Sequence, residues 1–242
     1  MGDSHRFRFF VDTLGVAGAT VALRPDDVRH ARVLRLGSGD GVEVVDLTGR
    51  VWLGDVIGAG VRLLEALDTA AAPRAQARIE LIAGALTGNA FDTLVDGAVQ
   101  AGVAQVTPLV ANARERARLI ERTARLRRIA EAAAKQSKRT SVPSIGAPID
   151  HDELMELPAG VVLDARGVAT LDRLLAAPGI GSGPQQADVT LLIGPAEGFE
   201  PAFVDGLEER GWRVARLGAT ILRAELAAAV AVAVAAMTLD RS

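Results

Sequence analysis

The chain has 242 residues, no cysteine and a formal net charge of −3, and 49% of its residues are hydrophobic. This apolar content supports a sizeable core rather than disorder, and the absence of cysteine excludes disulfides and cysteine-based zinc or catalytic sites. The N-terminal stretch MGDSHRFRFF lacks the apolar segment of a secretory signal, and the longest apolar run, Leu226 to Met237, is too short to cross a bilayer. We therefore expect a cytoplasmic protein with one large or two modest domains and no membrane partner.

The charge is distributed unevenly along the sequence. Between Arg114 and Arg139 there are ten basic residues and three acidic ones, so this stretch carries +7 and the remainder of the chain −10. Segregation of this kind favours a surface that binds a polyanion. A solvated amphipathic helix is the alternative interpretation of the same charge run.

Residues 1–72 predict a small β-barrel or sandwich, because short strand-like segments alternate with turns such as GSGDG and LTGR. The expected strands are 7–12, 20–24, 41–46, 50–57 and 60–67. One helix is expected at 26–34, with Asp26 or Asp27 as its cap. The Ala/Pro-rich stretch DTAAAPRAQA then predicts a domain boundary near residue 72.

Residues 73–242 predict an α/β domain, because strands and helices alternate and the strands are almost continuously apolar. The expected strands are 77–83, 104–110, 160–164, 188–193 and 212–217. The expected helices are 89–101, 116–138, 168–176, 200–210 and 221–238. Such a mostly parallel sheet brings the loops after its strands to one edge.

Common catalytic motifs are absent from this second part. The first strand is followed by GALTGNAFD, which is not a dinucleotide-binding glycine motif, and no P-loop, H-E-x-x-H or G-x-S-x-G occurs. Three histidines far apart in the sequence argue against a histidine-rich metal site, so no metal is expected. Three loops at strand ends remain as the candidate site: 163–167, 194–199 and 217–225.

The motifs GPAEGF and LGATILRAE, followed by a helix of small residues, resemble the SPOUT class of knotted methyltransferases. More narrowly they resemble the family that methylates N3 of a uridine in bacterial 16S ribosomal RNA. HARVLRLGSGDG, AGVAQVTPLVANARE and AAAKQSKRTSVP resemble further segments of that family, in the same order. The resemblance implies a PUA-like RNA-binding β-barrel (1–72) and a SAM-binding methyltransferase domain tied in a trefoil knot (73–242). It also implies a homodimer.

By the same resemblance, S-adenosylmethionine is the methyl donor. The residues implied to bind it are Leu163, Gly194, Pro195, Gly198, Leu217, Gly218, Ile221 and Leu222. Arg223 is the candidate for stabilising charge on the uracil carbonyl oxygens, since a guanidinium can donate two hydrogen bonds to a developing oxyanion. Glu225 is the candidate for orienting Arg223 or relaying a proton, and support of the helix start explains it equally well.

The RNA would be held by phosphate and shape contacts. Arg118, Arg122 and Arg125 recur at helical spacing on one face of the 116–138 helix, while Leu119, Leu126 and Ala133 share another. The full set of candidate RNA contacts is Arg8, Arg32, Arg35, Arg118, Arg122, Arg125, Gln136 and Arg139.

Two motifs depart from the family pattern. Where the family has G-P-E-G-G, this chain has Gly194-Pro195-Ala196-Glu197-Gly198, and a glutamate at a position of positive φ would be strained. Where the family has R-T-E-T-A or R-A-E-T-A, this chain has RAELA. Two alternatives therefore remain open: a catalytically impaired, RNA-binding relative, and a SPOUT methyltransferase that acts on another RNA.

Overall fold

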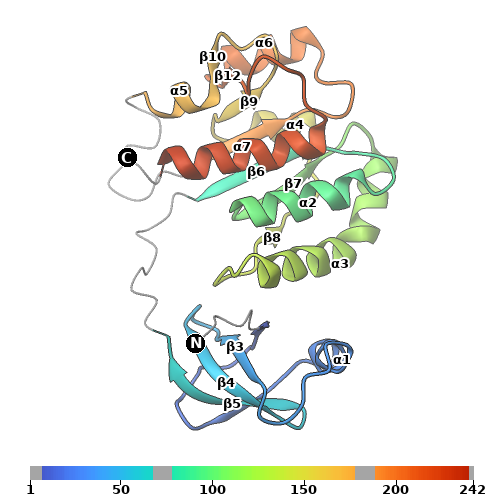
Figure 1. The fold of residues 1–242 in the computed structure, drawn as a ribbon. Helices are drawn as coiled ribbons and strands as arrows, with labels where there is room; N and C mark the ends of the chain where they lie inside the picture. Colours follow the sequence, from blue (N-terminus) through green and yellow to red (C-terminus); the bar gives the residue numbers. More distant parts are fainter. Residues whose placement is uncertain (1–6, 68–77, 178–188, 240–242) are drawn as a thin grey trace. The chain divides into compact units, whose positions relative to one another are not determined.

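The computed structural model describes residues 7–67, 78–177 and 189–239, which divide into two compact units (Figure 1). One unit contains the described residues up to 67 together with residues 134–142. The other contains residues 78–133 and the described residues from 143 onward. The domain boundary predicted near residue 72 lies outside the described residues.

The N-terminal unit is built on a five-stranded sheet in the order β1-β3-β4-β5-β2. Its strands are β1 (Arg8–Phe10), β2 (Thr20–Ala22), β3 (Gly41–Val45), β4 (Val51–Ile57) and β5 (Gly60–Ala66). Neighbouring strands are antiparallel, except β1 and β3, which are parallel. Each predicted strand is present, and alternate side chains such as Val42, Val44 and Leu63 form a dry core.

Helix α1 (Pro25–Val33) begins one residue earlier than predicted, and its predicted cap is wrong. Arg24 occupies the N-cap position without a side-chain cap, and Pro25 starts the helix because its fixed φ suits the first turn. Asp27 is instead buried, and its carboxylate accepts a 2.6 Å hydrogen bond from Lys135 Nζ.

Residues 134–142, at and beyond the end of α3 (Ala113–Gln136), are part of this first unit because ion pairs fix them to its sheet. The carboxylate of Glu43 accepts hydrogen bonds from Arg8 Nε and Lys138 Nζ, each 2.9 Å long. Arg8 also donates to the backbone carbonyls of Lys138 and Arg139. Burial opposes ionisation of Glu43, but the bonds from Lys138 and Arg8 outweigh it and lower the pKa.

The C-terminal unit contains a seven-stranded sheet, parallel throughout, in the order β10-β12-β9-β11-β6-β7-β8. The strands are β6 (Ile79–Gly84), β7 (Gln105–Leu109), β8 (Ser144–Ile145), β9 (Val161–Leu163), β10 (Ala169–Thr170), β11 (Val189–Ile193) and β12 (Arg213–Arg216). Besides α3, its helices are α2 (Ala90–Ala101), α4 (His151–Met155), α5 (Leu171–Leu175), α6 (Pro201–Glu209) and α7 (Ala224–Leu239).

Helices cover both faces of this sheet, as the α/β prediction required (Figure 1). On one face α7 packs against β6, β11, α2 and α5. On the other face Leu154 of α4 and Val204 and Leu207 of α6 pack on Leu192 and Val162. A strand or helix is present at each of the five strand and five helix positions predicted from the sequence. The predicted 168–176 helix begins too early, because residues 169 and 170 form β10 and α5 starts at Leu171. The sequence did not predict α4, β8 and β10, which have only two to five residues each.

Helix α7 is apolar on nearly every side, and its small residues let other helices approach closely. Ala228, Ala231 and Val232 are fully buried, and a Cβ placed on Gly97 of α2 would lie 3.1 Å from the Cβ of Ala229. Within the described ranges, no helix is both long and apolar enough to cross a membrane.

The turn between β3 and β4 is organised by the buried carboxylate of Asp46. It accepts hydrogen bonds from the backbone amides of Gly15, Thr48 and Arg50, from the Thr48 hydroxyl, and from Trp52 Nε1 at 3.0 Å. Burial by itself would raise the pKa of Asp46. The bonds from Thr48, Trp52 and the amide of Gly15 outweigh burial and lower the pKa to about 2.

We predict that Asp46 makes the stability of this unit depend on pH. The folded pKa of about 2 lies below the ordinary value of 3.8, so the stabilisation is present above pH 4 and is lost as pH falls towards 2. The free energy involved is about 2 kcal/mol. Urea unfolding of the wild type and Asp46→Asn between pH 2 and 7, followed by tryptophan fluorescence, measures it.

The two proteins should differ by about 2 kcal/mol at pH 7 and converge near pH 2. Glu65→Gln, which changes an exposed carboxylate on β5 of the same unit, is the matched control and should leave the stability nearly unchanged. A constant difference between Asp46→Asn and wild type across the whole pH range would contradict the assignment.

Candidate functional site

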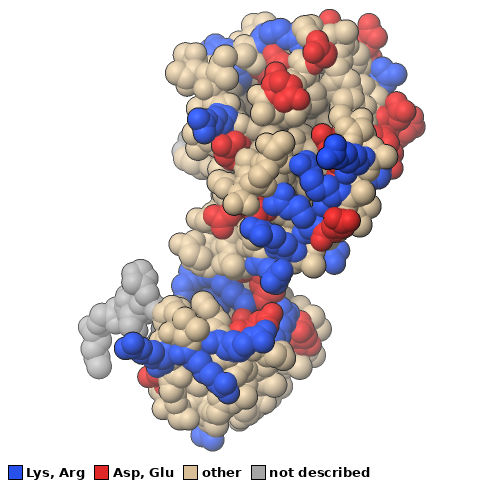
Figure 2. All heavy atoms as spheres, turned by 90° about the vertical axis from the view of Figure 1, so that its right-hand side faces the viewer, with Lys and Arg blue, Asp and Glu red and all other residues tan. Residues whose placement is uncertain are grey.

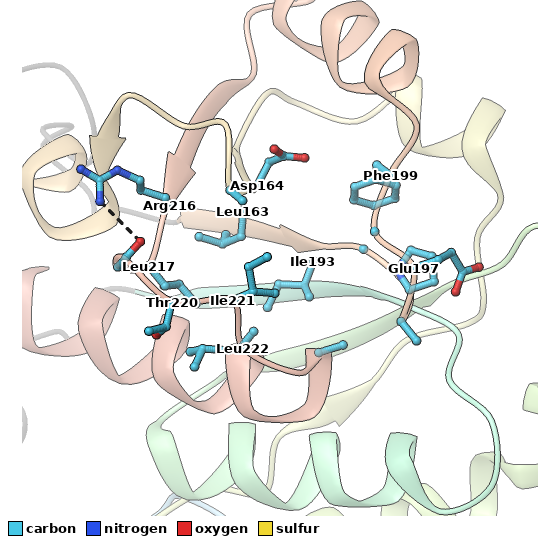
Figure 3. Close-up of a pocket in the computed structure, with 18 of the residues that line it drawn as sticks. Leu163, Asp164, Ile193, Glu197, Phe199, Arg216, Leu217, Thr220, Ile221 and Leu222 are labelled. Carbon is cyan, nitrogen blue, oxygen red and sulfur yellow. Dashed lines mark hydrogen bonds between the residues drawn. The ribbon is translucent and has the colours of Figure 1, made fainter.

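The loops that follow β9, β11 and β12 enclose a pocket in the C-terminal unit (Figure 3). The three strands are neighbours in the sheet and parallel, so their carboxyl ends lie at one edge although they are far apart in sequence. The cavity volume is about 370 Å³, within the range of small-molecule sites. This is the crevice that an open α/β sheet offers to a ligand.

All eight residues expected to bind the methyl donor line this one pocket. They are Leu163, Gly194, Pro195, Gly198, Leu217, Gly218, Ile221 and Leu222. The apolar wall also includes Ile193 and Phe199, neither of which was singled out from the sequence. Phe199 could have been noticed, because the chain has only eight aromatic residues and the GPAEGF motif contains one of them.

The altered loop 194–198 is closed by a turn in which the Gly198 amide donates to the Pro195 carbonyl at 2.9 Å. Gly198 has a φ of 80°, whereas Glu197 is not among the residues with positive φ. The strain expected at Glu197 is therefore not found, because the left-handed conformation falls on a residue that is still glycine. The side chain of Glu197 is exposed at the pocket.

The same loop is pressed against β6 without intervening side chains. A Cβ on Gly84, the last residue of β6, would lie 2.3 Å from the Pro195 nitrogen. A Cβ on Gly194 would lie 3.3 Å from Cδ2 of Phe199, whose ring in turn packs on Phe203 at 5.0 Å between centroids. Backbone packing thus holds the loop that forms one wall of the pocket.

Three charged side chains line the pocket: Asp164, Glu197 and Arg216. Arg216, at the end of β12, donates from Nη1 to the Gly218 carbonyl at 3.4 Å. Asp164 accepts hydrogen bonds from the amide and the Nε of Arg166, at 2.8 and 3.0 Å. The other lining residues are apolar or small, apart from the hydroxyl of Thr220.

The predicted catalytic pair lies beside the pocket and not among its lining residues. The Arg223 carbonyl accepts from the amides of Leu226 and Ala227, so Arg223 occupies the start of α7, and its side chain is exposed. Glu225 is half-buried in the first turn of α7. Between these two described side chains there is no ion pair, so the expected orientation of Arg223 by Glu225 is not seen, and the position of Glu225 suits the helix dipole.

The predicted basic face of α3 is present in the C-terminal unit, where Figure 2 shows Lys and Arg side chains gathered in a band. Arg122 and Arg125 both pair with the buried carboxylate of Asp92 on α2, at 2.6 and 2.7 Å. Arg118 points a partly buried guanidinium towards the Leu86 carbonyl at 3.5 Å. Leu119, Leu126 and Ala133, which share another face of α3, are buried.

The other five candidate RNA contacts belong to the N-terminal unit. Arg32, Arg35 and Gln136 are exposed, and Arg35 closes the C-terminal turn of α1 with a φ of 59°, which is unusual for a residue other than glycine. Arg139 is partly buried, and this burial lowers its pKa. Arg8, by contrast, has only 8% of its side chain exposed, in the ion pair with Glu43.

Within the residues that the structure describes, no group of three or more histidine or acidic side chains is close enough to hold a metal ion.

Comparison with known proteins matches residues 73–236 to the family of RNA methyltransferase domains and residues 23–66 to RNA methyltransferase PUA domains. Over 235 residues, the sequence is 28% identical to Ribosomal RNA small subunit methyltransferase E of Synechocystis, covering 94% of this chain and 76% of the relative. The Mycobacterium bovis protein of the same name is 26% identical over 236 residues, covering 92% and 88%.

Two solved structures share the fold. Ribosomal RNA small subunit methyltransferase E from Neisseria gonorrhoeae, bound to S-adenosyl methionine, gives a TM-score of 0.77 at 24% identity and covers 95% of this chain and 96% of that one. A putative methyltransferase from Legionella pneumophila, in complex with the same cofactor, gives 0.79 at 21% identity and covers 96% and 97%. The predicted fold, a PUA-like domain followed by a SPOUT-type α/β domain, is confirmed.

We predict that Gly84→Ala destabilises the pocket wall. The added methyl group would meet the backbone of Pro195 and Gly194, which cannot rotate away, so the free energy of unfolding should fall by about 1–3 kcal/mol. Gly206→Ala on α6 is the matched control: nothing lies within 4 Å, and alanine should stabilise the helix slightly. Urea unfolding of both variants measures the effect, and unchanged stability of Gly84→Ala would show that the loop is not held against β6.

Proposed function

This chain belongs to the family of RNA methyltransferase domains, and from that membership we propose that it methylates N3 of a uridine in 16S ribosomal RNA of the small subunit, with S-adenosylmethionine as the methyl donor. The observation that carries the proposal is the pocket at the ends of β9, β11 and β12, which gathers all eight residues expected to bind the donor. Relatives that align with nearly the whole chain and are named as small-subunit rRNA methyltransferases support the choice of substrate.

The residues present fit such a donor. The side chains of Leu163, Ile193 and Leu222 form an apolar wall for the adenine ring, and the loop backbone around Gly218 offers amides and carbonyls for its edge. The fit does not require Ala196 or Glu197 to take a strained conformation, since the loop turns at Gly198. When bound, the donor supplies a methyl group on a positively charged sulfur.

The chemistry requires N3 of the uracil to release its proton to solvent water and to attack that methyl carbon. The bond from N3 to the methyl carbon forms, the bond from sulfur to carbon breaks, and sulfur keeps the electron pair. Negative charge that develops on the uracil carbonyl oxygens is stabilised by a hydrogen-bond donor. We assign this role to the exposed guanidinium of Arg223, which follows the pocket residue Leu222 in sequence. We assign Glu225 to the first turn of α7, where it stabilises the helix start that presents Arg223.

We propose that both units contribute to holding the RNA. Arg32, Arg35 and Gln136 are exposed for phosphate contacts in the N-terminal unit, and Arg118, Arg122 and Arg125 present a basic face in the C-terminal unit. Arg139 is assigned to the same set, and Arg8 to holding the backbone of residues 138 and 139 in place. We further propose a homodimer that acts in the cytoplasm.

Donor binding is the first test. Calorimetric titration of the purified protein with S-adenosylmethionine should give a micromolar dissociation constant, about −8 kcal/mol, and titration with NAD should give no heat. Tritium from the labelled methyl group should then appear at N3 of a uridine in unmodified small subunits. Binding without transfer would favour an RNA-binding relative that has lost activity, and transfer to tRNA alone would favour the other alternative.

The role of Arg223 is tested by replacement. Arg223→Ala should lower the rate constant of methyl transfer by about 10²–10³-fold, since one transition-state donor is lost, and leave donor affinity within about twofold. Arg223→Lys should recover only part of the rate, because an ammonium cannot donate two parallel hydrogen bonds. Single-turnover kinetics with calorimetry separates the two quantities; equal loss of donor affinity and rate would assign Arg223 to donor binding instead.

A further inference from the structure

The carboxylate of Asp164 lines the pocket and is held by several hydrogen bonds. Asp164 directly follows the last residue of β9. Its backbone amide donates to the Ala215 carbonyl at 2.9 Å, and its backbone carbonyl accepts from the Gly167 amide at 3.1 Å. Only 15% of the side chain is exposed. Backbone and side chain are therefore fixed before any ligand arrives.

The two oxygens of the Asp164 carboxylate differ in their hydrogen bonding. Oδ1 accepts both hydrogen bonds from Arg166, at 2.8 Å from the amide and 3.0 Å from Nε. Oδ2 has no hydrogen-bond partner among the described residues, and Asp164 lines the pocket, as Figure 3 shows. One oxygen thus anchors the group, and the other is an acceptor available to a ligand.

The charges around Asp164 determine which kind of ligand group can bind to its Oδ2 atom. Arg166 already pairs with Asp164 through Oδ1, so the charge of this carboxylate is largely compensated and Oδ2 does not need an ionic partner. An ionised carboxylate also accepts strong hydrogen bonds from neutral hydroxyl groups. Carboxylates at the ends of parallel strands bind ribose hydroxyls in dinucleotide sites.

We propose that Asp164 binds the ribose hydroxyls of the nucleoside part of the donor, and that Arg166 acts as a positioning residue for its carboxylate. This inference rests on the proposed function, because it assigns one group of the same ligand. Asp205 on α6 lies 3.7 Å from the other end of the Arg166 guanidinium, in a long and exposed ion pair that contributes little. The pocket would then discriminate a ribonucleoside from its deoxy counterpart by one preorganised acceptor.

The test is a thermodynamic cycle that compares the binding of two ligands by two variants of the protein. The ligands are S-adenosylhomocysteine and its 2′,3′-dideoxy analogue, and the proteins are the wild type and Asp164→Ala, with dissociation constants measured by calorimetry. We expect Asp164→Ala to weaken S-adenosylhomocysteine about tenfold or more and to leave the affinity for the dideoxy analogue unchanged within twofold. Asp164→Asn keeps the shape of the side chain, and its affinity for S-adenosylhomocysteine should lie between those of the wild type and Asp164→Ala.

Two further variants separate a ligand contact from a structural effect. Asp205→Ala removes a carboxylate that touches Arg166 but does not line the pocket, and should leave both affinities within twofold. Arg166→Ala should weaken S-adenosylhomocysteine by a few-fold and the dideoxy analogue hardly at all.

The outcomes are distinguishable. An equal loss for both ligands in Asp164→Ala, or no loss for either, would overturn the assignment while the wild type still binds S-adenosylhomocysteine. A wild type that binds neither ligand would instead overturn the proposed function itself.

Discussion

The candidate site depends on one constraint, which is that β12, β9 and β11 are adjacent and parallel. Their register places Leu163, Ile193 and Ala215 side by side, so the segments that leave the three strands start at one level of the sheet edge. Residues that are far apart in sequence, such as Asp164, Gly194 and Leu217, are brought to one cavity by this register alone. A shift of one strand by a single residue would turn every side chain on it to the opposite face and take the pocket apart.

That arrangement in turn requires small residues where backbones meet. Gly84 lets the loop after β11 lie directly on β6, and Gly97 lets α2 approach α7 at Ala229. The alanine-rich α7 buries its length without large side chains, so the sheet and the helices at its end can pack closely. The glycines and alanines of this chain are therefore part of the site, although most of them never reach a ligand.

The sequence predicted those features that repeat over several residues. The apolar run before Gly194 identified β11, and the spacing of Arg118, Arg122 and Arg125 identified one face of α3. Two-residue strands such as β8 carry no periodic signal, so they were not found. The predicted start of α1 is one residue too late, although Pro25 marks the true start. The acidic residues that follow Pro25 are also typical helix caps, and they point to the later start.

Pairings between distant residues were beyond prediction. Asp92 lies 30 residues before Arg122, and only the packing of α2 on α3 shows that one carboxylate serves two arginines. The significance of Asp164 depends likewise on which of its oxygens Arg166 occupies, which no spacing reveals. Local motifs located the pocket, and three-dimensional contacts were needed to distinguish the groups available to a ligand from those already engaged.

Some basic side chains of residues 114–139 are already engaged in ion pairs, and this lowers the charge that the stretch presents to a ligand. Counted from sequence, residues 114–139 carry +7, but Arg116 pairs with Asp150, Arg122 and Arg125 with Asp92, Lys135 with Asp27, and Lys138 with Glu43. Each of these acidic partners lies outside the stretch, so the charge that a polyanion meets is smaller than the count. What the two pairs with Asp92 provide is position: they fix Arg122 and Arg125 against a buried carboxylate, and a fixed guanidinium loses less conformational entropy when a phosphate binds. The RNA surface that we propose would therefore rely on preorganisation more than on net charge.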